Sequence, residues 1–184
     1  MKNLALIIGL IFTLLVSATS WSQATVYYVS NEYGQDAEVE YKNVRHEKKS
    51  LILELNNGSK KTIDLTQEKV WGYRNSWGED FRIRSAKESQ RIIEYGPICV
   101  YSTNGVTATA SPEFTPGWED NPYRLNGTHT FSIQPDGKII KFSRARFMKA
   151  LRSDQKTYEK FRRLMDTHYN EMLIKIIEHN AELN

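Results

Sequence analysis

The chain has 184 residues, of which about 24 have the pattern of a removable export signal. The roughly 160 that remain are enough for one domain and too few for a multidomain enzyme. Apolar residues make up 40% of the sequence and charged residues 26%, and the formal net charge is +3. This composition excludes collagen-like, disulfide-dense and intrinsically disordered chains. Basic residues are not clustered densely enough to predict nucleic-acid binding, and we expect no nucleic-acid partner.

The N-terminus has the three parts of a signal peptide. Lys2 supplies a positive charge, residues 4–16 carry none, and Ser22–Ala24 offers a small-x-small cleavage site. The apolar run is shorter than the roughly 20 residues that cross a bilayer, and no later segment approaches that length, so no transmembrane segment is expected after cleavage. We therefore predict a signal peptide over residues 1–24, cleaved near Ala24, and a periplasmic or secreted product.

The rest of the chain changes period once. From residue 25 to 142 short apolar runs alternate with turn-forming residues, and from 143 to 184 apolar residues recur at helical spacing. We predict an α+β fold, with an antiparallel β-meander of about seven to nine strands, as a strongly curved sheet or partly open barrel, followed by two or three C-terminal helices. Both parts should share one core as a single domain over residues 25–184, with the helical tail covering the apolar side of one sheet.

Two hairpins can be predicted to the level of strand register. A three-residue loop over residues 57–59 would pair Leu53 with Ile63 and Leu51 with Leu65, which keeps one face apolar. A two-residue Asn-Gly turn would instead place these leucines opposite polar residues. We therefore favour the longer loop.

In the second hairpin, a loop at residues 76–78 leaves Trp77 at its tip. It pairs Tyr73 with Phe81 and Arg74 with Asp80, and it places Trp71 opposite Ile83 on the same face as Tyr73 and Phe81. A third hairpin turns at residues 135–137 and pairs Ile133 with Ile139. Between these hairpins, residues 91–95 and 98–102 are predicted to be strands joined by a bend.

The helical tail begins at Ser143, a good N-cap, and Ser153 with Asp154 caps a second helix. The apolar stripes of the helices bury either on the sheet or on another chain, and the oligomeric state stays open. The stripes comprise Phe147, Met148 and Leu151, then Tyr158, Phe161, Leu164 and Met165, then Met172, Leu173, Ile176 and Ile177. From Lys141 onward the chain has ten basic and six acidic residues. This basic excess indicates either contact with an anionic surface or a helix face exposed to solvent.

The sequence contains no Gly-rich phosphate loop, G-x-S-x-G elbow, H-E-x-x-H motif or EF-hand loop. On one helix, His168 and His179 would lie about 16 Å apart, too far to share an ion, so we expect the four histidines to lie on the surface. We expect no metal and no cofactor. Cys99, the single cysteine, lies in an apolar run and is predicted to be a core residue without catalytic function.

Carboxylates leave one catalytic alternative open. A glycosidase needs two of them about 5 to 9 Å apart across a cleft, a separation that sequence cannot show. The candidates are Glu38, Glu40, Glu54, Asp64, Glu79, Asp80, Glu113, Glu119 and Asp120.

The candidate binding residues are aromatic. Phe114, Trp118 and Tyr123 lie in a proline-punctuated segment over residues 111–123, and Trp77 lies at its hairpin tip. Aromatic side chains on a rigid loop offer large contact area at low entropic cost, so they suit a sugar or a peptide. Alternatively, the three loop aromatics fold back and close one end of the sheet.

The stretches 68–74, 80–83 and 93–101 resemble a group of uncharacterised exported proteins of Bacteroidota-type bacteria, in which a "WGY" strand and an aromatic-Arg strand precede short helices. The segment from 135 to 140, leading into Ser143, is similar as well. The resemblance implies export and a β-then-α layout. It implies no catalytic residue, because no activity is established for the group.

These observations favour an exported, non-enzymatic domain that contacts a protein or glycan of the cell envelope. The alternative is a small hydrolase that acts on envelope polymers through a carboxylate pair. A third hypothesis makes the helical tail an oligomerisation or docking element.

Overall fold

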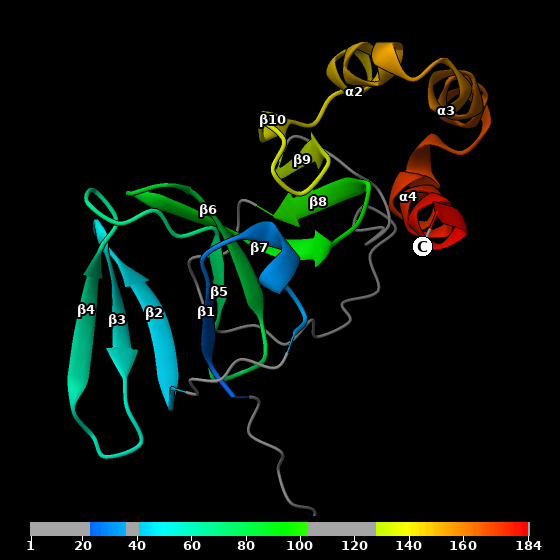
Figure 1. The fold of residues 1–184 in the computed structure, drawn as a ribbon. Helices are drawn as coiled ribbons and strands as arrows, with labels where there is room; N and C mark the ends of the chain where they lie inside the picture. The colour runs from blue at the N-terminus through cyan, green and yellow to red at the C-terminus, as the bar shows by residue number, and fades with distance from the viewer. Residues whose placement is uncertain (1–22, 36–40, 103–127, 184) are drawn as a thin grey trace, which may run out of the picture.

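A computed structural model describes residues 23–35, 41–102 and 128–183. In these residues ten strands form two antiparallel sheets and precede three α-helices, which confirms the predicted α+β class and the strand-then-helix order (Figure 1). The strands are β1 (Thr25–Tyr27), β2 (Asn43–Glu47), β3 (Ser50–Glu54), β4 (Lys60–Asp64), β5 (Gly72–Arg74), β6 (Asp80–Ser85), β7 (Glu88–Glu94), β8 (Ile98–Ser102), β9 (His129–Ile133) and β10 (Ile140–Lys141). The helices are α2 (Arg144–Ala150), α3 (Gln155–Thr167) and α4 (Met172–Leu183), with short 3-10 turns η1 (Ser30–Glu32), η2 (Leu151–Ser153) and η3 (Tyr169–Glu171).

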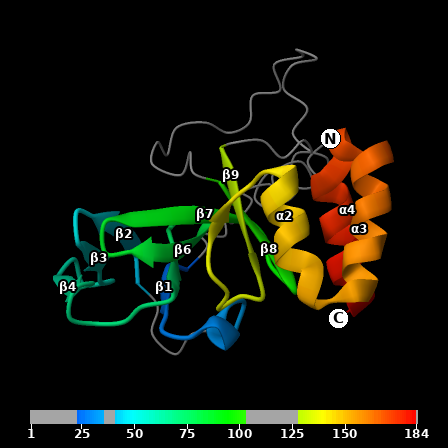
Figure 2. The same cartoon turned by 90° about the horizontal axis from the view of Figure 1, so that it is seen from above.

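The strands divide into two sheets where the sequence predicted one. The larger has seven strands in the order β1-β5-β6-β7-β8-β9-β10, the smaller is β2-β3-β4, and neither closes into a barrel. The split arises because β1 pairs with β5, far along the chain, and the β2–β4 meander forms between them without joining that sheet. The small sheet and the helices lie at opposite ends of the large sheet (Figures 1 and 2).

The β3–β4 hairpin has a three-residue loop, but the predicted register is wrong by two residues. Leu51 lies opposite Ile63, and Leu53 lies opposite Lys61. The loop occupies residues 56–58 because Gly58, with φ +81°, takes the left-handed position that closes it. A shift of two residues keeps each side chain on its predicted face, so Leu51, Leu53 and Ile63 are still fully buried.

The predicted register of the β9–β10 hairpin is also wrong, here by one residue. Phe131 lies opposite Ile140, so Ile133 and Ile139 are not partners. The chain already turns at Gln134, which has φ +70° and donates its backbone N–H to the carbonyl of Pro97. Because β10 has only two residues, no ladder extends back to Ile133.

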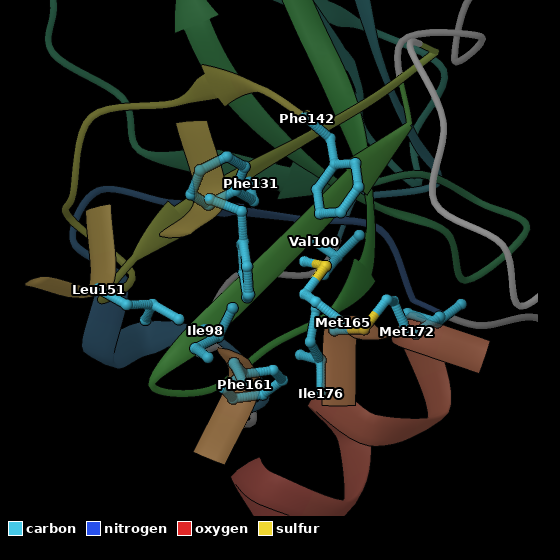
Figure 3. Packing of buried hydrophobic residues seen from close by; sticks show 11 residues of the cluster. Ile98, Val100, Phe131, Phe142, Leu151, Phe161, Met165, Met172 and Ile176 are labelled. Carbon is cyan, nitrogen blue, oxygen red and sulfur yellow. The ribbon is translucent and has the colours of Figure 1, made fainter. Parts of the chain in front are cut away.

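Among the described residues, the buried apolar side chains form two clusters. The first lies between the small sheet and one side of β5 and β6, and its members include Val44, Leu53 and Phe81. The second lies between β8, β9 and the helices (Figure 3). In it the rings of Phe131 and Phe147 meet edge to face at 5.1 Å.

The helical tail begins and packs as its sequence predicts. The Ser143 side chain accepts the N–H of Arg146, and the Asp154 side chain accepts the N–H of Thr157, so both predicted caps are confirmed. The helices α2, α3 and α4 lie on the β8 and β9 side of the large sheet (Figure 2), and their apolar stripes pack with residues of β8 and β9 in the second cluster. Ile177 is the exception, at 41% exposed. The helices are thus part of this chain's own core.

One polar contact fixes α4 to the sheet. Ile98 follows the bend between β7 and β8, and Asn180 of α4 hydrogen-bonds to both its N–H and its carbonyl. Its Oδ1 accepts the N–H of Ile98 at 3.0 Å, and its Nδ2 donates to the carbonyl of Ile98 and to Glu94, both at 2.9 Å. A Cβ on Gly96 would lie 2.7 Å from the Asn180 amide, so glycine is required for this approach.

Candidate interaction site

The β5–β6 hairpin forms as the sequence predicts. Tyr73 lies opposite Phe81, Arg74 lies opposite Asp80, and the loop occupies residues 76–78. Gly78 has φ +78°, the left-handed conformation that such a loop needs. The predicted pairings and the predicted position of Trp77 at the tip are therefore confirmed.

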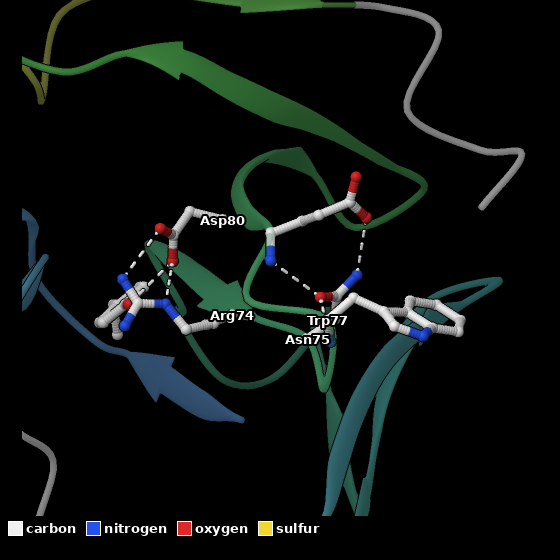
Figure 4. A network of polar contacts seen from close by, with 6 residues as sticks. Arg74, Asn75, Trp77 and Asp80 are labelled. Atoms are coloured by element: carbon white, nitrogen blue, oxygen red, sulfur yellow. Dashed lines mark hydrogen bonds and ion pairs between the residues drawn. The ribbon is translucent and has the colours of Figure 1, made fainter. Parts of the chain in front are cut away.

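Asn75 holds the loop from inside (Figure 4). Its side chain is buried, and its Oδ1 accepts the backbone N–H groups of Trp77 and Glu79, both at 3.0 Å. Its Nδ2 donates to Glu79 Oε2 at 3.0 Å, and the backbone of Ser76 donates to Asn43 Oδ1 on β2. These bonds fix the backbone on both sides of Trp77.

The base of the hairpin is joined to β1. Asp80 accepts two hydrogen bonds from the Arg74 guanidinium, at 2.9 and 3.0 Å, and a third from the hydroxyl of Tyr27 at 2.9 Å. Burial, followed by the nearby Asp80 charge, raises the pKa of Tyr27. The hydrogen bond to Asp80 raises the pKa of Arg74. The base of the hairpin is thus stabilised by a charged, bidentate contact between Arg74 and Asp80.

Trp77 is 67% exposed, more than any other large apolar side chain in the described residues. A fixed backbone under an exposed indole gives a flat apolar surface whose orientation is set in advance. Asn75 was missed in the sequence, although an Asn directly before a Ser-Trp-Gly loop is a typical signal of side-chain capping in a turn.

Trp71 was predicted on the face of Tyr73 and Phe81, and this is wrong. The strand β5 begins only at Gly72, so the alternation does not extend to Trp71, whose ring instead contacts aromatic rings outside that cluster. The guanidinium of Arg82 lies 4.6 Å from the Trp71 ring and donates to its carbonyl at 2.8 Å. The neighbouring rings are those of Tyr27, Tyr33 and Tyr95. Trp71 is buried and serves packing.

Of the four predicted binding residues, the structure places only Trp77. Phe114, Trp118 and Tyr123 lie outside the described residues. The candidate site is therefore the β5–β6 tip, residues 75–79.

Four of the candidate carboxylates are described, and each is bonded to a cation or a hydroxyl. Glu54 pairs with Lys42, Glu79 with Arg91 and Asp80 with Arg74. Asp64 accepts hydrogen bonds from Thr66, which lower its pKa. The remaining candidates, Glu38, Glu40, Glu113, Glu119 and Asp120, lie outside the described residues. These four groups thus contribute to ion pairs and a turn.

The histidines and the cysteine have structural contacts. His179 was predicted at the surface, but it is buried against the Phe161 ring, and burial together with the Lys160 charge lowers its pKa. His46 forms hydrogen bonds with Ser89 and with the carbonyl of Ala86.

Cys99 is fully buried, as predicted, and burial raises its pKa. Among the described residues, no group of three or more His, Cys, Asp or Glu side chains could hold a metal ion.

Comparison with known proteins gives no relative. The chain matches no protein-family model, and neither a curated protein nor a solved structure matches it. Within the described segments, no helix has the length and apolar character needed to cross a membrane.

Proposed function

We propose that this protein is an exported, non-enzymatic domain of the cell envelope that binds a protein or glycan partner through Trp77. The observation that carries the proposal is the 67% exposure of this indole on a loop whose backbone Asn75 fixes. The signal-like pattern over residues 1–24 supports export to the periplasm or beyond the cell.

The physical argument concerns the entropy of binding. Ordering a loop or a long side chain on association costs about 0.5 to 1.5 kcal/mol per group, and a contact residue that is already ordered avoids this cost. Tryptophan also offers the largest flat apolar surface of any side chain, which suits the face of a sugar ring or a pocket on a protein. The Trp77 loop combines both properties.

The test compares two aromatic truncations. Trp77→Ala should remove binding in a glycan array and in crosslinking to isolated envelopes, whereas Tyr28→Ala, at another exposed aromatic position, should leave both signals intact. Both side chains are exposed, so neither change is expected to unfold the protein. Trp118→Ala is measured in parallel. If Trp77→Ala leaves every signal unchanged, binding through Trp77 is refuted, and if Trp118→Ala does so as well, binding through either aromatic is refuted.

A further inference from the structure

The outer side of α2 and η2 carries a row of basic side chains. Arg146, Lys149 and Arg152 follow one another at a spacing of three residues, and all three are exposed. They point away from Phe147 and Leu151, which are buried in the core beneath. We call Arg146, Lys149 and Arg152 the basic face.

The charges of the basic face are not balanced by ion pairs with other described residues. None of its three residues has an ion-pair partner within the described part of the chain. The acidic group that follows in sequence, Asp154, accepts hydrogen bonds from the backbone and hydroxyl of Thr157. Four other basic residues of the helices form ion pairs with carboxylates, namely Arg144–Asp166, Lys160–Glu182, Arg162–Glu159 and Lys175–Glu178.

We propose that the basic face docks the protein on a membrane surface that presents anionic lipid phosphates. Along the helix the three cations extend over about 9 Å, which suits several headgroups in one plane better than one small anion. None of the large exposed apolar side chains of the described residues belongs to α2 or η2. The contact is therefore electrostatic, without insertion into the acyl region, and salt weakens it.

The site is independent of Trp77. Helix α2 packs at the β9 end of the seven-stranded sheet, whereas Trp77 lies on the β5–β6 hairpin next to β2. The two surfaces can therefore be tested separately, and failure of one proposal leaves the other standing.

The experiment measures partition of the full chain into two kinds of vesicle, phosphatidylcholine alone and phosphatidylcholine with about a quarter phosphatidylglycerol. The readout is the ratio of the two partition coefficients, so that charge-independent adhesion by the apolar residues 4–16 cancels. Each basic side chain near such a surface contributes a factor of about five. The triple variant R146Q/K149Q/R152Q should therefore lower the ratio by roughly tenfold to a hundredfold.

The matched control is K49Q/K60Q/K61Q, which removes the same charge from exposed positions on and beside the small sheet. It should leave the ratio within about twofold of the parent, and a high salt concentration should abolish the preference of the parent. Circular dichroism and thermal unfolding confirm that both variants fold. An equal loss in both triple variants, no preference of the parent for the anionic vesicles, or full displacement by millimolar inorganic phosphate would each overturn the proposal.

Discussion

Asn180 should contribute more to stability than any other single polar side chain of the helices. Replacing it by Ala removes three hydrogen bonds and leaves both peptide groups of Ile98 without a partner. Ile98 is 2% exposed, so water cannot readily replace the lost bonds. A buried peptide group without a partner costs about 1 to 3 kcal/mol, so Asn180→Ala should lower the free energy of unfolding by about 3 to 4 kcal/mol. For a domain of this size that corresponds to a Tm lower by roughly 10 °C.

A double-mutant cycle tests the cause. Gly96→Ala places a Cβ 2.7 Å from the Asn180 amide, and no atom other than those of Asn180 is among its three closest contacts. Gly96→Ala should therefore destabilise the parent but cost much less in the Asn180→Ala background, so the two changes are not additive. Urea unfolding of the four proteins measures this coupling, with Leu183→Ala as the exposed control on the same helix. Loss of less than about 1 kcal/mol in Asn180→Ala, or strictly additive changes, would refute the reasoning.

Three further predictions concern the hairpin and the helix caps. Asn75→Ala should speed hydrogen exchange at the Trp77 amide, because the carbonyl that accepts it is gone, and weaken partner binding without abolishing it. Burial raises the pKa of Tyr27, so folding favours its neutral form and the free energy of unfolding falls as the pH rises above the usual pKa of 10.0. Tyr27→Phe should make this decline at alkaline pH shallower, as measured by urea unfolding. Hydrogen bonds from Thr157 lower the pKa of Asp154, so its carboxylate stabilises the folded protein above the usual pKa of 3.8, and this stabilisation is lost as the pH falls through the lower folded value. Asp154→Asn should therefore make the loss of stability at acid pH shallower.

The sequence predicts those features that local chemistry decides. At the β5–β6 hairpin one glycine fixes the turn, and the pairing of Tyr73 with Phe81 and of Arg74 with Asp80 agrees with it, so the register is correct. At β3–β4 the loop was predicted from the apolar pairing of Leu53 with Ile63, which places it one residue too late, because the left-handed Gly58 closes the turn at residues 56–58 instead. The predicted faces are nevertheless correct, because burial depends only on the alternation.

Pairing between distant segments is where sequence reasoning fails. Nothing in β1 indicates that it pairs with β5, and this pairing separates β2–β4 from the larger sheet. The contact of Asn180 with Ile98 joins residues 82 positions apart and has no local signal. Such contacts depend on how whole strands and helices pack together, and a short stretch of sequence does not contain that information.

The two apolar clusters have a consequence for the candidate site. The cluster beneath the β5–β6 hairpin contains residues of β2, β3 and β4 but none of the helices, whereas the helices share the other cluster with β8 and β9. A variant that loosens α4, such as Asn180→Ala, should therefore leave the backbone around Trp77 unchanged while the protein remains folded. Partner binding through Trp77 should then persist in Asn180→Ala at temperatures below its lowered Tm. Loss of binding there would mean that the two clusters are coupled through β6 and β7, and that the hairpin tip depends on the helical end of the sheet.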